Sequence, residues 1–391
     1  MKKLTYLTVS FVAAATMILI GVAAFFTQPK ANAATECAGS IVMEYDTGTI
    51  LSERNADEKR PIASMVKIMT LLLSWEAVDC GKISLDQQVQ ISANAASMGG
   101  SQMFLESGDT YAVSDLIKGI TVVSANDASV QMAELLSGSV ESFVERMNQR
   151  AGELGMTNTK FANCTGLPDE KEQYSTARDV SIMMRELLSH EGYYGFSRIY
   201  MENFNHPDGR ITEFVNTNKL VRFYKDCDGG KTGFTNEAMF CLSATAKRNG
   251  MRVIATVLGS PDSKTRFKEI TGLFNDAFAN YSVQTVVEKK PIENNIVVEN
   301  GKTSAIAVEP KEEIRLLLDK NKRNGLKVEL EIEDTLIAPI SIGQKVGTLR
   351  VVDENGAVLG ETELVSLTEI AKLTYWDALL KTLSNWQILR K

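Results

Sequence analysis

The spacing of hydrophobic and polar positions changes along the chain and predicts where helices give way to strands. Short apolar runs on either side of Asp46-Thr47-Gly48 predict a β-hairpin over residues 38–54. From there to about residue 200, the apolar positions follow the period of amphipathic helices. The clearest predicted helices are Ile62–Val78, Val113–Ser124, Ala128–Leu136, Val140–Leu154 and Thr176–Leu188.

Strand patterns return after this helical stretch. Ala238–Thr245 and Met251–Leu258 lie on either side of the turn Arg248-Asn249-Gly250, and Thr265–Asn280 then has a helical pattern. These strands are joined by hairpins and not by helical crossovers. The pattern therefore predicts a mainly antiparallel sheet with helices packed on it. We therefore expect an α/β (α+β) domain over residues 34–281.

The chain beyond this domain shows strand patterns only. Lys327–Glu333 alternates strictly between charged and apolar residues. Its apolar side is expected to form one buried face, made by Val328, Leu330 and Ile332. Tight turns are expected at Asn324-Gly325 and Asn355-Gly356. These patterns predict a separate small all-β domain over residues 282–366, without a catalytic grouping.

The N-terminal segment has the pattern of an export signal. Lys2 and Lys3 precede an uncharged apolar run, which is followed by the small residues Ala31-Asn32-Ala33. This order predicts a secretory signal peptide over residues 1–33, cleaved after Ala33. An uncleaved membrane anchor is the alternative, because the run is long enough to span a bilayer. Both interpretations place the rest of the chain outside the cytoplasm.

Residues 367–391 predict an amphipathic helix that lies on a membrane surface. The apolar side of this helix is formed by Leu373, Trp376, Leu379, Leu380, Leu383 and Trp386. Tryptophans and the terminal cations Arg390 and Lys391 suit the membrane interface. The alternatives are a helix that docks on the chain's own β domain and a helix that dimerises.

Charge and cysteine content exclude several classes of protein. Without the signal segment, 39 basic residues stand against 49 acidic ones. Such an acidic chain lacks the basic stripe that binds nucleic acid. The five cysteines are widely spaced, and no Cys/His grouping resembles a zinc site, so we expect neither metal nor cofactor. One or two disulfides could form after export, although we expect all five cysteines to be structural.

Ser64-Met65-Val66-Lys67 is the strongest chemical feature. The predicted helix around it is apolar on all sides between Pro61 and Trp75, and Lys67 is its only charge. A buried ammonium is costly unless it finds partners or loses its proton. Ser64 lies one turn away on the same face, so the pair could form an activated nucleophile. Taken alone, the motif also fits a snorkelling lysine and a helix-capping serine.

Two further polar groupings lie at predicted element boundaries. Ser124-Ala125-Asn126 separates two apolar segments and could bring Ser124 and Asn126 to the first pair, or cap the next helix through Asn126 or Asp127. Lys231-Thr232-Gly233 follows two glycines, which let a ligand backbone approach closely. Lys231 and Thr232 could hold a carboxylate there. A glycine-rich loop with a solvated lysine is the alternative.

In this order, S-x-x-K, S-x-N and K-T-G form the motif set of penicillin-binding proteins and class A β-lactamases. Over nearly its whole length, the chain resembles the low-molecular-mass serine D-Ala-D-Ala carboxypeptidases of the penicillin-binding family. The resemblance extends to the context of the motifs, in Gly99-Gly100-Ser101-Gln102-Met103, Gly155-Met156, Asn163, Gly166-Leu167-Pro168, Thr176-Ala177-Arg178-Asp179 and Asp228-Gly229-Gly230. Gly230 departs from the family at a position that is usually bulkier. The resemblance implies a transpeptidase/β-lactamase-like domain.

The resemblance also implies a reaction and its residues. Ser64 would attack the penultimate D-Ala of a peptidoglycan stem pentapeptide, with Lys67 taking its proton and Ser124 returning one to the leaving D-Ala. β-Lactams would acylate the same serine. The cell wall and the outer face of the bacterial cytoplasmic membrane are the implied location.

Substrate binding is implied for the other motif residues. Lys231 would bind the terminal carboxylate together with Thr232 and Gly233, and its charge would lower the pKa of Lys67. Asn126 would orient Lys67 and the substrate amide. The backbone N–H groups of Ser64 and Phe234 would form the oxyanion hole.

Other hydrolase classes fit the sequence less well. No G-x-S-x-G elbow occurs, and His190 and His206, the two histidines, are both expected at the surface, which excludes a Ser-His-Asp triad. A β-lactamase remains an alternative, because Glu170 and Glu172 lie where class A enzymes carry their glutamate, although without an E-x-x-x-N grouping. An endopeptidase on the same fold and a non-catalytic wall-binding protein are the remaining alternatives.

Overall fold

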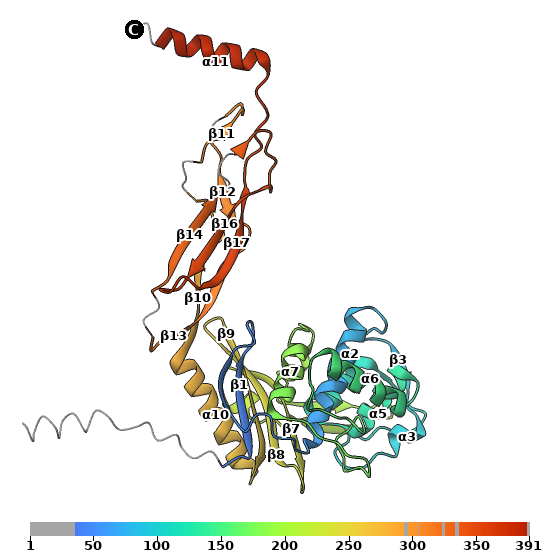
Figure 1. Cartoon of the computed structure of the whole chain (residues 1–391). Helices are drawn as coiled ribbons and strands as arrows, with labels where there is room; N and C mark the ends of the chain where they lie inside the picture. Colours follow the sequence, from blue (N-terminus) through green and yellow to red (C-terminus); the bar gives the residue numbers. More distant parts are fainter. Residues whose placement is uncertain (1–35, 293–295, 304, 323–324, 333–335, 389–391) are drawn as a thin grey trace, which may run out of the picture.

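The computed structural model describes residues 36–292, 296–303, 305–322, 325–332 and 336–388. The expected signal segment 1–33 and the turn residue Asn324 lie outside these ranges. Among the described residues, no helix is long and apolar enough to cross a bilayer. The chain forms an α/β domain, then an elongated region of strands, then a terminal helix (Figure 1).

An antiparallel sheet of five strands, in the order β2-β1-β9-β8-β7, forms the centre of the first domain. The predicted hairpins supply four of the strands, β1 (Gly39–Glu44), β2 (Ile50–Arg54), β8 (Met239–Arg248) and β9 (Met251–Ser260). β7 (Cys227–Thr235) lies at the edge and pairs with β8, with Lys231 opposite Ser243. The K-T-G motif therefore lies on an edge strand, which pairs with another strand of this sheet on one side only.

Helices cover both faces of this sheet. On one face, α10 (Ser263–Asn280) packs Ile270, Phe274 and Phe278 against the strands. On the other, α7 (Ala177–Leu187) contacts β1 and β9 and joins a lobe of helices (Figure 1). This lobe and its connections contain the 3-10 turn η1 (Ala63–Val66), α2 (Lys67–Asp79), α3 (Ala93–Ala96), α4 (Val113–Val122), α5 (Asn126–Ser137), α6 (Val140–Glu153), α8 (Tyr193–Ser197) and α9 (Leu220–Phe223). Two small hairpins complete it, β3 (Gln88–Gln90) with β4 (Thr110–Ala112), and β5 (Met201–Asn205) with β6 (Ile211–Val215).

The S-x-x-K motif spans η1, which holds Ser64, and the start of α2, which begins at Lys67 and runs through the middle of this lobe. α2 contacts α4, α5, α6 and α7, and every residue from Lys67 to Trp75 is buried. The expectation of a helix apolar on all sides is confirmed. Because α2 is packed from every direction, the surrounding core fixes the position of Lys67.

Strands dominate after α10, as predicted. β10 (Tyr281–Val287) pairs with β13 (Ile314–Asp319), and a four-stranded sheet has the order β12 (Val308–Pro310), β17 (Val358–Ser366), β16 (Lys345–Val352), β14 (Lys327–Ile332). A short parallel pair joins β11 (Val298–Glu299) to β15 (Leu336–Ile337). The core between these layers includes Ile314, Leu316, Leu349, Val351 and Leu364.

One expectation in this region is wrong. The strand over Lys327–Glu333 is present as β14, but Val328 is 52% and Leu330 45% exposed. Their cross-strand partners, Val351 and Leu349, are buried. β14 is the edge strand, and the layer formed by β10 and β13 packs over β17. The alternation thus identified a strand, while the position of that strand at the sheet edge left its apolar side in solvent.

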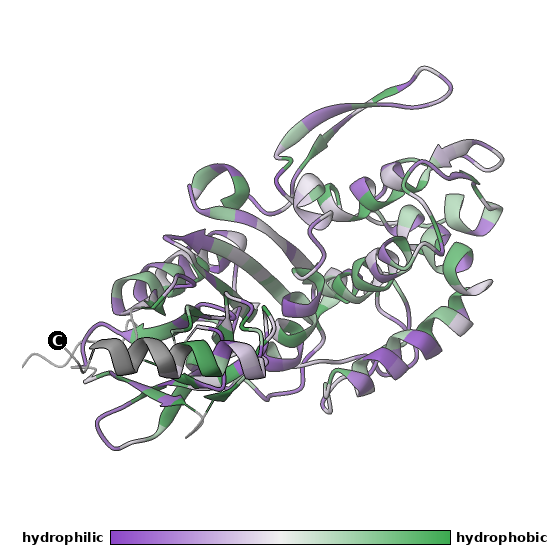
Figure 2. Cartoon of the chain, turned by 90° about the horizontal axis from the view of Figure 1, so that it is seen from above, coloured by the Kyte–Doolittle hydropathy of each residue, from purple (hydrophilic) through white to green (hydrophobic). Residues whose placement is uncertain are grey.

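A terminal helix is present as α11 (Tyr375–Ile388). Tyr375, Trp376 and Leu380 are largely exposed, and Figure 2 shows a hydrophobic stretch in the described turns of this helix. The expected apolar positions Leu383 and Trp386 belong to side chains outside the described set. Its amphipathic character therefore stays a prediction.

Candidate active site

Ser64 and Lys67 meet where η1 passes into α2. The Lys67 Nζ lies 3.0 Å from the Ser64 Oγ and donates a hydrogen bond to the Thr165 carbonyl at 2.6 Å. Lys67 is fully buried, whereas Ser64 is partly exposed. Burial lowers the pKa of Lys67 to about 7. A neutral amine at this distance can accept the proton of the serine hydroxyl.

The backbone around Ser64 is strained and tightly packed. Ala63 has a φ of 47°, a left-handed conformation that non-glycine residues rarely adopt. The loop that supplies the Thr165 carbonyl presses on this turn, because a Cβ at Gly166 would lie 2.0 Å from the Ala63 carbonyl oxygen. The Asn163 Oδ1 holds the loop by accepting the N–H groups of Thr165 and Gly166. One loop thus positions both Ser64 and Lys67.

Ser124 and Asn126 lie at the junction of α4 and α5. Ser124 has a φ of 65°, and its hydroxyl accepts a hydrogen bond from the Lys231 Nζ at 2.8 Å. The Asn126 Nδ2 donates to the Gly99 carbonyl at 2.6 Å. Its Oδ1 is buried without a partner among the described residues. The strained serine and the free acceptor are features of a binding site.

The alternative role of these residues as helix caps is not supported. The N-cap of α5 is Ala125, and no side chain caps it. The Asp127 carboxylate instead accepts the backbone N–H groups of Met103 and Leu105, at 3.1 Å each for the nearer oxygen. Asp127 therefore holds the segment after Gly99-Gly100 in place beside Asn126.

Lys231, Thr232, Gly233 and Phe234 follow one another along β7. Lys231 is buried, and the Thr232 hydroxyl donates to the Thr217 Oγ1 at 2.8 Å. A Cβ at Gly233 would lie 2.6 Å from the Ile62 carbonyl oxygen, so the strand passes directly against the turn before Ser64. Phe234 is half exposed. The structure thus brings the three motifs together.

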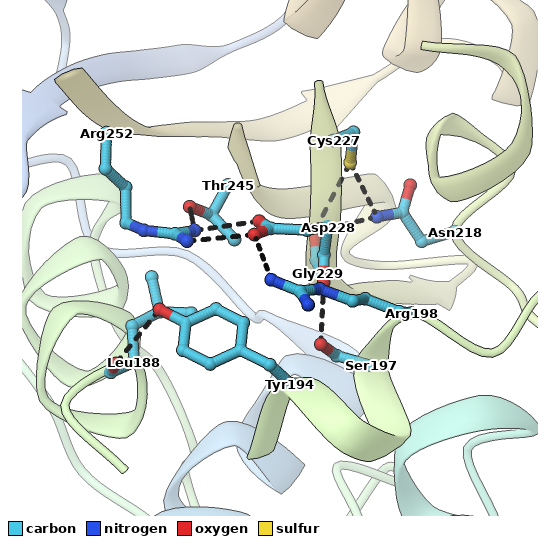
Figure 3. A network of polar contacts seen from close by, with 10 residues as sticks. All are labelled: Leu188, Tyr194, Ser197, Arg198, Asn218, Cys227, Asp228, Gly229, Thr245 and Arg252. Carbon is cyan, nitrogen blue, oxygen red and sulfur yellow. Dashed lines mark hydrogen bonds and ion pairs between the residues drawn. The ribbon is translucent and has the colours of Figure 1, made fainter. Parts of the chain in front are cut away.

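A buried ion pair anchors the start of β7 (Figure 3). The Arg252 guanidinium donates to both carboxylate oxygens of Asp228, at 2.7 and 2.8 Å. The Ser197 hydroxyl donates to the Asp228 carbonyl, and Asn218 donates to the Gly229 carbonyl. Gly230, the residue at which the sequence departs from the family, has a φ of 140°. A Cβ added there would lie 2.5 Å from the Ser243 carbonyl oxygen. Only glycine fits this backbone.

Three basic residues, Lys67, Lys231 and Arg266, are buried at the motifs. Burial lowers the pKa of Lys231 well below its ordinary value, and the charges of Lys67 and Arg266 lower it further. Arg266 donates to the carbonyls of Gly233 and Cys241 at 3.4 and 3.1 Å, and within the described ranges no carboxylate pairs with it. Burial lowers its pKa to about 10. Burial lowers the pKa of Lys67, and the expected contribution of the Lys231 charge to that shift is not found, although the Lys67 charge does lower the pKa of Lys231. A bound anion would favour the charged forms of Lys231 and Arg266.

The structure differs from expectation at the two histidines and at the cysteines. His206 is buried, because its loop folds back and its ring contacts the Tyr111 hydroxyl at 2.8 Å and the Thr212 hydroxyl at 2.9 Å. His190 is partly buried against Asp79. All five cysteines are free, so the disulfides considered possible are absent from this structure.

Three contributors to the site were missed by the sequence analysis. The Thr165 carbonyl has no sequence signal beyond its place between Asn163 and Gly166. Thr217 lies in the polar run Asn216-Thr217-Asn218, which could have been singled out. Arg266 lies on the same side of α10 as Ile270 and Phe274, which is the buried side. A cation on an apolar helix side could have been recognised from the sequence.

One acidic group could in principle hold a metal. Glu106, Asp109 and Asp208 place carboxylate oxygens within 4.8 Å of one another in the described part of the chain. Arg210 forms ion pairs with Glu106 and Asp208, so one cation already offsets part of this negative charge. The group is separate from the three motifs.

Comparison with known proteins agrees with the geometry. The D-alanyl-D-alanine carboxypeptidase family matches residues 26–262, and the C-terminal domain of penicillin-binding protein 5 matches residues 281–372. The chain is 41% identical over 354 residues to D-alanyl-D-alanine carboxypeptidase DacF of Bacillus subtilis, covering 90% of each protein, and 32% identical to DacC of Escherichia coli, covering 88% of each. The crystal structure of penicillin-binding protein 5 from Haemophilus influenzae is 30% identical, with a TM-score of 0.69 over 88% of this chain and 99% of that one.

Proposed function

This chain belongs to the D-alanyl-D-alanine carboxypeptidase family of serine peptidases, and from that premise we propose that Ser64 is the residue acylated by peptidoglycan stem peptides. One observation carries the assignment. Lys67 is buried, has a pKa lowered to about 7, and places its amine 3.0 Å from the Ser64 hydroxyl. A wall-binding protein without catalysis has no need of this arrangement.

Acylation begins when the neutral Lys67 amine takes the proton of Ser64 and the Oγ attacks the carbonyl of the penultimate D-Ala. The backbone N–H groups of Ser64 and Phe234 stabilise the oxyanion, a contribution of about 3–4 kcal/mol for each donor. The Ser124 hydroxyl, held by Lys231, relays the proton that Lys67 took from Ser64 to the leaving D-Ala amine, so that both Lys67 and Ser124 return to their starting states. Water then hydrolyses the ester, which releases the shortened peptide and restores Ser64.

Lys231 and Thr232 bind the terminal carboxylate of the substrate. Burial lowers the pKa of Lys231, and a bound carboxylate would favour its charged form, which supports this role. The free Asn126 Oδ1 is an acceptor for a substrate amide N–H. β-Lactams, which carry a carboxylate beside a reactive carbonyl, acylate Ser64 from the same position.

The test is intact mass spectrometry after benzylpenicillin, together with release of D-Ala from a stem-pentapeptide analogue. Wild type should gain one penicilloyl group and release D-Ala, whereas Ser64→Ala should do neither. Labelling of that variant would show that the nucleophile is misassigned. Rapid steady-state hydrolysis of nitrocefin would favour the β-lactamase alternative, and cleavage of cross-linked dimers would favour the endopeptidase.

Location is part of the same proposal. The expected signal peptide over residues 1–33 exports the chain, and α11 holds it at the outer face of the cytoplasmic membrane, next to its peptidoglycan substrate. Exposed Tyr375, Trp376 and Leu380 support an interfacial role for this helix.

A further inference from the structure

The short helix α9 presents cations and an aromatic ring to solvent beside β7, the strand that carries the K-T-G motif. Leu220 is the buried residue of this helix. Lys219, Arg222 and Lys225, on the helix and at its two ends, are exposed. Phe223 is 73% exposed. The helix is thus held to the protein by one side chain, and most of its other residues are free to contact a partner.

Tyr200 extends this exposed surface. The ring centroids of Tyr200 and Phe223 lie 6.0 Å apart, and the Arg222 guanidinium lies 5.9 Å from the Tyr200 ring centroid. Single exposed apolar residues are common, but aromatic rings gathered with an arginine are typical of binding surfaces. We call this surface the α9 patch, formed by Lys219, Tyr200, Arg222, Phe223 and Lys225.

No carboxylate balances the three cations of the α9 patch within the described residues. The acidic residues that follow them in the sequence, Asp226 and Asp228, form ion pairs with Arg248 and Arg252. The whole chain has a net charge of −7, so the patch is a local concentration of positive charge on an acidic protein. Such a surface attracts anions, and it attracts them less at high salt.

The polar run Asn216-Thr217-Asn218 joins the α9 patch to the substrate-binding strand. The Asn216 N–H donates to the Tyr200 carbonyl at 2.7 Å, and the Asn218 Oδ1 accepts the Leu220 N–H at 3.2 Å. Between them, the Thr217 hydroxyl accepts a hydrogen bond from Thr232. Phe223 follows Thr217 by six positions, a reach of at most about 20 Å along the chain. A polymer bound at Thr232 can therefore also contact the patch.

We propose that the α9 patch binds a second, non-reacting part of the peptidoglycan strand whose stem peptide acylates Ser64. Carboxylates of neighbouring stem peptides pair with the three cations, and sugar rings of the strand pack on Phe223 and Tyr200. Because one strand carries many stem peptides, holding it raises the local concentration of reacting ends. The enzyme therefore prefers polymeric peptidoglycan to a free pentapeptide. This inference rests on the proposed function, because that function identifies the polymer.

The experiment compares D-Ala release from two substrates by the full chain. One is insoluble, pentapeptide-rich peptidoglycan from which hydrofluoric acid has removed phosphate polymers, and the other is a soluble stem pentapeptide. Combining Lys219→Gln, Arg222→Gln and Lys225→Gln should lower the ratio of kcat/KM on peptidoglycan to kcat/KM on pentapeptide about tenfold at low salt, the combined effect of three exposed ion pairs. High salt should reduce this difference from wild type. Phe223→Ala should lower the ratio about fivefold at any salt concentration, because it removes a ring contact.

A control variant and a binding measurement complete the design. Lys264→Gln, Lys268→Gln and Lys289→Gln together remove three exposed lysines that also lack an ion pair in the described part of the chain, and they should keep the wild-type ratio. Sedimentation of the Ser64→Ala chain with the stripped peptidoglycan measures binding apart from catalysis. The three glutamine changes in the patch should weaken this binding about tenfold.

The outcomes separate this proposal from the proposed function. An unchanged ratio and unchanged sedimentation in both patch variants, with melting profiles like that of wild type, would overturn the α9 patch. Sedimentation with the intact wall but not with stripped peptidoglycan would also overturn it, because a phosphate polymer would then be the partner. Failure of wild type to release D-Ala from either substrate, without acylation of Ser64, would instead refute the proposed function, while sedimentation of the Ser64→Ala chain would still report on the patch.

Discussion

Lys67 and Lys231 owe their chemistry to removal from water. In solvent both amines would be protonated, and neither could serve as a base near neutral pH. Burial changes this at Lys67, whose pKa falls to about 7 while Ser64 and the Thr165 carbonyl remain as its partners. Burial also lowers the pKa of Lys231 and of Arg266, so a bound anion would favour their charged forms.

The pH dependence of acylation follows from this shift. The neutral, active form of Lys67 increases as pH rises through about 7, so the second-order rate of acylation by benzylpenicillin should rise about tenfold per pH unit below that value and level off above it. Mass spectrometry of quenched samples between about pH 5.5 and 8.5 measures this rate.

Lys67→Arg is the matched control, because a guanidinium stays protonated over the whole range. It should show no acylation at any of these pH values. A wild-type rate that does not change with pH would mean that Lys67 is not the base.

At the scale of elements, the site depends on close contacts between segments far apart in sequence. The loop at Gly166 and the strand at Gly233 both press on the turn before Ser64, and both positions lack room for a side chain. Ser64 is therefore placed by two neighbouring elements as well as by its own 3-10 turn, η1.

Gly166→Ala tests this contact. The added Cβ would lie 2.0 Å from the Ala63 carbonyl oxygen at a φ of 81°, so the loop or the Ser64 turn must move. We expect acylation by benzylpenicillin to slow by about 100-fold, the usual cost of misplacing a reactive group by about 1 Å. Gly272→Ala in α10, where nothing lies within 4 Å, should leave the rate unchanged. Equal rates in both variants would remove the loop from this role.

The edge strand β14 allows a second test at this scale. Val328 and Val351 are cross-strand partners, but Val328 is half exposed and Val351 is buried. Val351→Thr should lower the free energy of unfolding by about 1–3 kcal/mol, because it buries a hydroxyl in an apolar core. Val328→Thr should change it by less than about 0.5 kcal/mol. Denaturant unfolding of the two variants measures both values, and similar losses would place β14 inside the core.

On the scale of the whole molecule, the motifs all belong to the first domain, and the β region carries the chain on to α11 (Figure 1). This arrangement fits an enzyme held at a surface by its C-terminal end. The membrane role of α11 is the part of it that needs a direct test.

A chain ending at Leu373, which keeps all of β17 and the buried core residue Ile370, tests that role. It lacks α11 and keeps every motif residue, so it should acylate with benzylpenicillin like the full chain but leave the membrane fraction. Sedimentation with vesicles containing anionic lipid, followed by fluorescent penicillin labelling, measures both properties. Equal membrane binding of the two chains would contradict the proposal and favour docking or dimerisation of the helix.

The sequence by itself determined the order of elements and the chemistry. Periodicity identified the hairpins and helices, because the local pattern of apolar residues reflects which backbone conformation can bury them. It also singled out Ser64 and Lys67, since a lone cation on an apolar helix requires a reason.

Only the tertiary structure decided which groups meet and which surfaces are covered. The Thr165 carbonyl, Thr217 and Arg266 reach the motifs through contacts between distant segments. Val328 is exposed and His206 buried for the same reason, since burial depends on the layer that packs against a residue, and the local pattern does not contain that layer.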